Sequence, residues 1–221
     1  MKKIAIIGAG ISGLFIANLL KKNPNYQISI YEKNDSINLE ESYGIQLSMN
    51  SVKLLNEIGF NELSEKVKFN PDKVDFYSIN KNKKICDLNI SDFNSQDCKY
   101  TTLKRSVLIN FLKRELGNLI ITDHNISKID QQAQQIKLSF ENKEIYKCDY
   151  LIISDGVFSK GKSLISGNKS NAIYNNFIAV RGSISKENLQ SISDENVSLF
   201  LGSDFHYVVY PLNKDKNFYF I

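Results

Sequence analysis

The sequence predicts an α/β fold, in which a Rossmann-like βαβ layer is interleaved with a second, mostly antiparallel sheet. Two observations carry this prediction. Residues 3–32 follow the order apolar strand, glycine-rich turn, helix and second strand, which is that of a parallel βαβ unit. Short strand-like segments rich in β-branched and aromatic residues then fill 71–99 and the stretch from 175 onward, as a second sheet would require.

The first strand and its turn indicate nucleotide binding. "KIAIIGAG" is a β-branched run that stops at glycine, as a buried parallel strand does. "GAGISG" then gives G-x-G-x-x-G: Gly8 permits the tight turn, Gly10 lets the backbone approach a pyrophosphate, and Gly13 lets the helix lie close on the sheet. The next helix, with Ser12 in its first turn, presents N–H groups and the positive end of its dipole to phosphate.

The second strand completes this fingerprint. A dinucleotide site asks for an acidic residue about 20 positions after the glycines, and "YQISIYEKND" ends on Glu32, followed by Lys33. A carboxylate there is suited to the two hydroxyl groups of a ribose. A purely structural βαβ unit is the alternative.

Composition excludes several other classes. The opening apolar run is broken by glycines and by the lysine pair at 21–22, short of the roughly 20 residues of a membrane-spanning helix; we therefore expect no export signal and no transmembrane segment. The net charge is only +4, and the lysines are scattered, so no nucleic-acid partner is expected. Three cysteines without a C-x-x-C pair and only two histidines predict no disulfide framework and no metal site, and favour the cytoplasm.

The remaining elements follow in order. We expect a helix in "MNSVKLLNEIG" that stops at Gly59, two strands around the "NKNK" turn, and an amphipathic helix over 104–116. Several short strands follow, then the buried strand "CDYLIIS" and a final group of strands.

This order predicts two interleaved domains. The nucleotide-binding domain would comprise 1–70 and 100–165, and the second sheet domain 71–99 and 166–221. The last strand runs to the final residue without a closing helix, so we expect the second domain to be incomplete at its C-terminus.

Four stretches, in this order, resemble the FAD-dependent aromatic hydroxylases (class A flavoprotein monooxygenases). They are "GAGISG…YEK", "GIQLSMNSVKLLNEIG", "RSVLINFL" and "CDYLIISDGVFSKGKSLI". The resemblance implies that Gly44 and Ile45 run beside the flavin ring and that Arg105 contacts the cofactor from the start of its helix. It also implies that Asp155 and Gly156 take part in binding FAD and the nicotinamide cofactor. "FIAVRGSI" and "FHYVVYPL" are similar to substrate-domain strands of the salicylate hydroxylase-like branch.

The resemblance implies an NAD(P)H- and FAD-dependent monooxygenase. Such an enzyme uses NADH or NADPH and O2 to hydroxylate a small aromatic substrate, phenolic or quinol-like, and a homodimer is compatible with it. The cofactor carries the difficult chemistry, so few titratable catalytic groups are expected. A flavin oxidase or dehydrogenase of the same fold, and a non-catalytic FAD- or nucleotide-binding remnant, are the alternatives.

His206 and Tyr210 are candidate substrate-orienting residues. They are four apart in an expected strand, so both side chains point to one face. A histidine and a phenol in one pocket wall could orient a hydroxylated ring and assist its deprotonation. The alternative is a half-buried aromatic strand without a catalytic role.

The chain also departs from the family pattern. Members of the family are longer and carry a G-D-A-A-H-like segment after the substrate sheet, which this sequence does not contain. Lys162 stands where an arginine usually closes the D-G motif, and lysine keeps the charge without the bidentate fork. We therefore expect a truncated form of such an enzyme.

Overall fold

The computed structural model describes residues 1–37, 39, 43–168, 173–189, 192–214 and 218–221. The chain divides into two compact units, each built from two separate stretches. Unit 1 comprises Met1–Leu39 and Ile109–Asn176, and unit 2 comprises Glu40–Leu108 and Phe177–Ile221. The functional domain limits expected from the sequence stay a prediction.

A parallel four-stranded sheet forms the centre of unit 1. Its order is β12-β1-β2-β8, and each neighbouring pair runs parallel. The strands are β1 (Lys2–Ile7), β2 (Tyr26–Tyr31), β8 (Ile120–Ile121) and β12 (Tyr150–Ile153), with helix α1 (Ile11–Leu20) between β1 and β2. The apolar run of β1 is buried from Ile4 to Ile7. The predicted βαβ layer is thereby confirmed.

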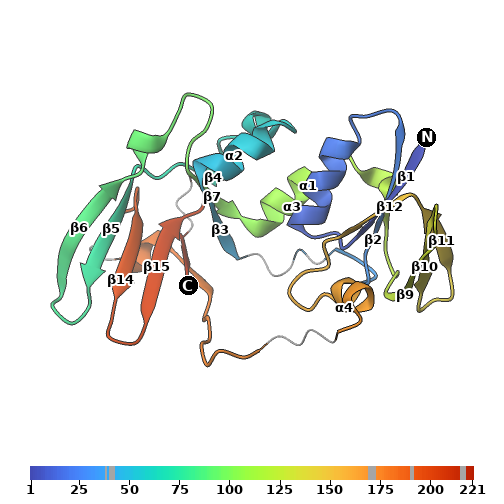
Figure 1. Cartoon of the computed structure of the whole chain (residues 1–221). Helices are drawn as coiled ribbons and strands as arrows, with labels where there is room; N and C mark the ends of the chain where they lie inside the picture. Colours follow the sequence, from blue (N-terminus) through green and yellow to red (C-terminus); the bar gives the residue numbers. More distant parts are fainter. Residues whose placement is uncertain (38, 40–42, 169–172, 190–191, 215–217) are drawn as a thin grey trace. The chain divides into compact units, whose positions relative to one another are not determined.

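A second, antiparallel sheet completes unit 1. It has the order β11-β10-β9, from β9 (Ile126–Gln131), β10 (Ile136–Phe140) and β11 (Ile145–Cys148) (Figure 1). A core of Ala5, Ile7 and Tyr31 with Ile126, Leu138, Phe140 and Cys148 joins it to the parallel sheet. Helix α4 (Lys160–Ser166) follows β12. The core therefore fixes the carboxyl ends of β1 and β2 beside the start of β9.

Unit 2 is built on a six-stranded, mostly antiparallel sheet of order β13-β16-β15-β14-β5-β6. Its strands are β5 (Lys73–Ser78), β6 (Lys83–Asn89), β13 (Gly182–Ile184), β14 (Val197–Leu201), β15 (His206–Pro211) and β16 (Phe218–Phe220). Figure 1 shows β5 beside β14, and this pair runs parallel. It joins the middle of the chain to its last part, as the predicted second sheet requires.

Shorter elements complete unit 2. A small sheet of order β3-β7-β4 contains β3 (Gly44–Leu47), β4 (Lys68–Phe69) and β7 (Thr101–Lys104). The helices are α2 (Met49–Asn56) and α3 (Arg105–Lys113), of which α3 runs across the boundary into unit 1. The 3-10 turns are η1 (Phe60–Glu62), η2 (Ser91–Phe93) and η4 (Lys186–Asn188) in unit 2 and η3 (Gly117–Leu119) in unit 1.

The predicted helices are present in shortened form. α2 is followed by turns up to Gly59, whose φ of +86° is left-handed, a conformation that glycine adopts at low cost. The helix expected over 104–116 is α3, and the 3-10 turn η3 follows it in the chain. Among the described residues, no helix is long and apolar enough to cross a membrane.

Candidate functional site

The glycine-rich turn packs directly against the end of β12, the strand that pairs with β1 on the side opposite β2. Gly8 has a φ of +101°, and a Cβ on it would lie 2.5 Å from the backbone oxygen of Ser154. A Cβ on Gly13 would lie 2.0 Å from the backbone oxygen of Gly8. Both distances are far below van der Waals contact. Glycine is therefore required at both positions, so that α1 can start close to β1 and β12.

The start of α1 is open in contrast. Gly10 is the N-cap residue in extended conformation, no side chain caps the helix, and its first turn holds no acidic residue. A Cβ placed on Gly10 would meet no described atom within 4 Å. The first-turn N–H groups, including that of the exposed Ser12, thus face open space with the positive end of the helix dipole. This arrangement fits the pyrophosphate of a dinucleotide.

Glu32 is fixed against the glycine turn. One carboxylate oxygen accepts a hydrogen bond of 2.9 Å from the backbone N–H of Ala9, and the other accepts one of 3.1 Å from the N–H of Asn34. The backbone N–H of Glu32 donates to the carbonyl of Ile121 at 2.9 Å. The carboxylate therefore stands at the end of β2 in a defined orientation, beside the open start of α1.

A cavity of about 220 Å³ lies at these strand ends, within unit 1. Its wall includes four residues singled out in the sequence: Gly8, Glu32, Lys33 and Asp155. The carboxyl ends of parallel strands are where open α/β sheets bind ligands. The structure thus brings together residues that are far apart in the chain at the expected edge of the sheet.

The same wall holds residues that sequence reasoning missed, among them His124, Phe158 and Lys160. The Nδ1 atom of His124 lies 2.6 Å from the carbonyl of Thr122, and since a carbonyl only accepts, Nδ1 carries the proton. His124 follows β8, a third parallel strand of the sheet. The signal that could have identified His124 in the sequence is its position just after β8, because the carboxyl ends of parallel strands meet at one edge of the sheet.

The carboxylate of Asp155 is hydrogen-bonded to the start of α4. One carboxylate oxygen accepts a hydrogen bond of 2.9 Å from the N–H of Gly161, and the other accepts from the hydroxyl of Ser159. Ser159 in turn caps the helix by accepting from the N–H of Lys162 at 2.9 Å. Gly156 has a φ of +83°, and a Cβ on it would meet nothing within 4 Å. The D-G turn thus orders α4 while its backbone borders open space.

Gly44 and Ile45 lie in β3 of unit 2. Gly44 is buried, and a Cβ on it would lie 2.8 Å from atoms of Tyr210, Leu212 and Tyr219. Ile45 pairs with Leu103 of β7 and is partly exposed. A side chain at 44 would therefore displace the aromatic core of the large sheet.

Arg105 begins α3, and its backbone N–H donates to the carbonyl of Tyr43 at 2.8 Å. Its guanidinium lies 5.6 Å from the centre of the Tyr43 ring, and that of Arg181 lies 4.8 Å from the same centre. Arginine on an aromatic face is a favourable contact. Unit 2 thus places two guanidinium groups near one tyrosine ring. Arg181 was not among the residues singled out from the sequence.

His206 and Tyr210 occupy different environments at the two ends of β15. His206 is exposed, whereas Tyr210 is only 2% exposed and packs with Val197, Leu212 and Tyr219. Burial raises the pKa of the Tyr210 phenol, and Tyr219 and Tyr100 raise it further. The phenol therefore stays protonated at neutral pH and can donate a hydrogen bond. The predicted joint role of the pair in substrate orientation stays a prediction.

The chain resembles known proteins in sequence. Residues 6–39 match the family model of the NAD(P)-binding Rossmann-like domain. The FAD-dependent monooxygenase dpasE of Apiospora sacchari is 23% identical over 165 residues, which cover 72% of this chain and 34% of that protein.

Solved structures resemble the whole chain. A variant of Klebsiella pneumoniae HpxO, complexed with FAD, superposes with a TM-score of 0.82 at 17% identity, covering 100% of this chain and 56% of that one. The 2,6-dihydroxypyridine-3-hydroxylase of Arthrobacter nicotinovorans gives 0.79 at 17% identity, covering 99% and 56%. The fold is that of the class A FAD-dependent monooxygenases, and the chain spans about half the length of these structures.

Proposed function

We propose that this chain provides the FAD-binding layer and part of the substrate sheet of a monooxygenase. The enzyme would use NADH or NADPH and O2 to hydroxylate a small aromatic substrate, phenolic or quinol-like. The observation that carries the proposal is the position of the Glu32 carboxylate, bonded to Ala9 beside the open start of α1 at Gly10. This arrangement occurs in a chain that follows the class A monooxygenase fold over all of its 221 residues.

The residues of unit 1 fit the adenosine diphosphate half of FAD. The turn of Gly8, Gly10 and Gly13, with Ser12, would receive the pyrophosphate on backbone N–H groups. Glu32 would accept from the ribose hydroxyls while its bond to Ala9 holds the carboxylate in place. FAD, when bound, supplies the redox and oxygen chemistry of the reaction.

Lys33, Asp155 and Gly156 extend this set along the same edge. Lys33 and Asp155 line the 220 Å³ cavity together with Glu32. The carboxylate of Asp155 holds α4, so its contribution to the cofactor would come through the position of the turn. Gly156 leaves the backbone of that turn open to a ligand.

Unit 2 would supply the flavin-facing and substrate-facing residues. Gly44 and Ile45 would offer their strand backbone to the flavin, and Arg105 a positive charge. The neutral phenol of Tyr210 would donate a hydrogen bond to an oxygen of the substrate, and His206 would orient the ring from the other end of β15. The similarity of "FIAVRGSI" and "FHYVVYPL" to salicylate hydroxylase-like enzymes supports an aromatic acid or phenol as substrate.

Flavin retention through desalting tests the proposal, with Gly10→Val as the decisive variant. The added side chain meets no described protein atom close to its Cβ, but it would fill the expected pyrophosphate position. Wild type should keep flavin absorption bands and Gly10→Val should lose them. Ala133→Val, which introduces the same side chain at an exposed position of unit 1 outside the cavity wall, should keep them.

A second measurement separates catalysis from binding alone. NADH and NADPH oxidation, measured with phenolic acids and with their non-aromatic analogues, should be stimulated only by the aromatic compounds. Retention of flavin without such stimulation would leave a flavin-binding protein and contradict the monooxygenase proposal. Equal flavin retention by wild type and Gly10→Val would contradict the assigned pyrophosphate site.

A further inference from the structure

The wall of the nucleotide cavity in unit 1 contains more basic side chains than its proposed ligand needs. Lys33, His124 and Lys160 line it together with the carboxylates of Glu32 and Asp155. The ribose hydroxyls and the base of an adenosine are neutral, and the pyrophosphate is assigned to the start of α1. The contacts of these basic groups therefore decide whether the cavity can take a further phosphate group.

The carboxylate of Glu141 engages two residues of this wall from the turn between β10 and β11. Glu141 is not among the described residues that line the cavity. One carboxylate oxygen accepts from Lys160 Nζ at 2.6 Å, and the other accepts from Asn125 Nδ2 at 2.9 Å. Lys160 begins α4 and Asn125 directly precedes β9. A single carboxylate thus takes up donors from two separate elements of the wall.

The ring of His124 is engaged by the same turn, through a second glutamate. Its Nδ1 lies 2.6 Å from the carbonyl of Thr122, and its Nε2 lies 3.0 Å from a carboxylate oxygen of Glu144. The Nδ2 of Asn142 also approaches Nε2, at 3.4 Å. Both ring nitrogens therefore face groups of the protein rather than a ligand in the cavity.

The charge of Glu141 is retained at neutral pH. The hydrogen bond from Lys160 holds the pKa of the Glu141 carboxyl below its ordinary value, so the carboxylate offsets the ammonium group. Lys33 is exposed and directly follows Glu32, whose carboxylate offsets it in turn. The wall therefore carries no surplus of positive charge for a phosphate, and a phosphate beside the Glu32 carboxylate would be repelled.

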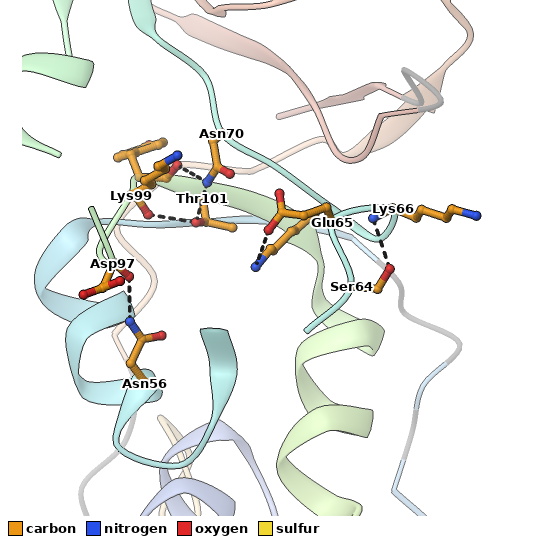
Figure 2. Close-up of polar contacts among 10 residues, drawn as sticks. Asn56, Ser64, Glu65, Lys66, Asn70, Asp97, Lys99 and Thr101 are labelled. Atoms are coloured by element: carbon orange, nitrogen blue, oxygen red, sulfur yellow. Dashed lines mark hydrogen bonds and ion pairs between the residues drawn. The ribbon is translucent and has the colours of Figure 1, made fainter. Parts of the chain in front are cut away.

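The Lys160–Glu141 pair is open to solvent, unlike an ion pair that borders a separate cavity of unit 2. There the side chain of Lys68 is 8% exposed and lies 2.9 Å from Glu65, and Figure 2 shows the Glu65 carboxylate in that contact. The side chains of Lys160 and Glu141 are 42% and 55% exposed. Loss of the Glu141 charge would therefore release Lys160 without leaving a buried charge, and the fold should tolerate it.

We propose that Glu141 makes this cavity select a nucleotide whose adenosine ribose carries no phosphate. The inference rests on the proposed function, because it takes Glu32 as the ribose-binding residue. Glu141 occupies the ammonium of Lys160 and an N–H of Asn125, which would otherwise be donors for an added 2′- or 3′-phosphate. FAD meets this condition, whereas NADPH carries a 2′-phosphate on that ribose. Glu141 would thus keep NADPH from competing with FAD for the site.

Displacement of FAD by AMP and by adenosine 2′,5′-bisphosphate, followed by FAD fluorescence at constant ionic strength, tests this role. The two competitors differ only in the 2′-phosphate, so the Kd of the bisphosphate divided by the Kd of AMP isolates its effect. For the wild type this ratio should be above one. Glu141→Gln should lower it about fivefold, and Glu141→Asp, which keeps the charge, should lower it less.

Two further variants assign the effect to the freed lysine. Glu115 forms an exposed pair with Lys21 at 3.9 Å in unit 1, and neither residue is among the described ones that line the cavity. Glu115→Gln is therefore the matched control and should leave the ratio unchanged. Lys160→Met, introduced together with Glu141→Gln, should return the ratio to the wild-type value, because the released ammonium is then absent.

Three results would overturn the assignment of Glu141. They are an unchanged ratio in Glu141→Gln, an equal loss of affinity for both competitors, which would mean that Glu141 only supports the wall, and a wild type that prefers the bisphosphate. The proposed function fails in a different way. A wild type that binds neither FAD nor AMP has no nucleotide site, and the selection by Glu141 is then wrong as well.

Discussion

The carboxylate of Glu32 and the backbone N–H of Ala9 are joined by a hydrogen bond of 2.9 Å across 23 residues of sequence. This bond ties the end of β2 to the glycine turn, so the residue proposed to bind ribose also stabilises the loop proposed to bind pyrophosphate. Loss of the Glu32 carboxylate would therefore weaken both parts of the cofactor site at once.

We predict that Glu32→Ala raises the Kd for FAD about 10- to 100-fold, because hydrogen bonds to a charged group contribute about 1.5–3 kcal/mol. Glu32→Gln keeps an oxygen that can accept from Ala9, so its effect should be smaller. Fluorescence titration of FAD measures both. Glu187→Ala, at an exposed position in unit 2, is the control, and equal Kd values for all variants would contradict the role of Glu32.

Gly13→Ala should destabilise the fold more than Gly10→Ala, which changes only the N-cap residue of α1. The new Cβ at 13 would lie 2.0 Å from the oxygen of Gly8, while that at 10 meets open space. Overpacking of this kind costs about 1–3 kcal/mol. Urea unfolding measures the difference, with the midpoint lowered further for Gly13→Ala than for Gly10→Ala. A Gly13→Ala protein as stable as wild type would mean that α1 can move away from the turn.

The fold and the turn were predictable because their signals are local. Gly8, Gly10, Gly13 and Glu32 fall at spacings set by one strand, one turn and one helix, and the apolar run of β1 identifies a buried strand. The alternation of short strands after 175 likewise indicated a second sheet.

The remaining features of the candidate site depend on contacts between parts of the chain that are distant in sequence. His124 and Lys160 reach the wall of the cavity through strand order, which short-range patterns do not contain. The different burial of His206 and Tyr210 depends on which end of β15 is covered. The engagement of Asp155 with α4 depends on how the chain turns after β12. Each of these facts is set by tertiary packing.

The three cysteines should react with a thiol reagent in the order of their exposure. Cys86 is exposed, Cys98 is intermediate and Cys148 is buried, and burial raises the pKa of the Cys148 thiol to about 11. The thiolate is the reacting species, so Cys148 should react only after unfolding. Ellman's reagent at pH 8, with and without urea, measures this. Cys86→Ser should remove the fast phase, and fast labelling of Cys148 in the native protein would contradict its burial.

Stability should fall in alkaline solution because of the buried tyrosines. Burial raises the pKa of Tyr210 and of Tyr31 above the ordinary value of 10. Below about pH 10 both states are protonated and pH has no effect through these groups, whereas above it the unfolded chain loses protons that the folded chain keeps. Each group should then cost about 1.4 kcal/mol of unfolding free energy per pH unit, until the pH reaches its folded pKa.

Tyr210→Phe isolates one of these groups. Because phenylalanine does not titrate, the variant should lose less unfolding free energy than wild type between pH 9 and pH 11, by about 1.4 kcal/mol. Tyr174→Phe, at an exposed tyrosine, should follow the wild-type curve. Urea unfolding at each pH gives the comparison. Parallel curves for wild type and Tyr210→Phe would mean that the Tyr210 phenol ionises in the folded protein as readily as in the unfolded chain, and it could then serve as a base rather than as the hydrogen-bond donor proposed for the substrate.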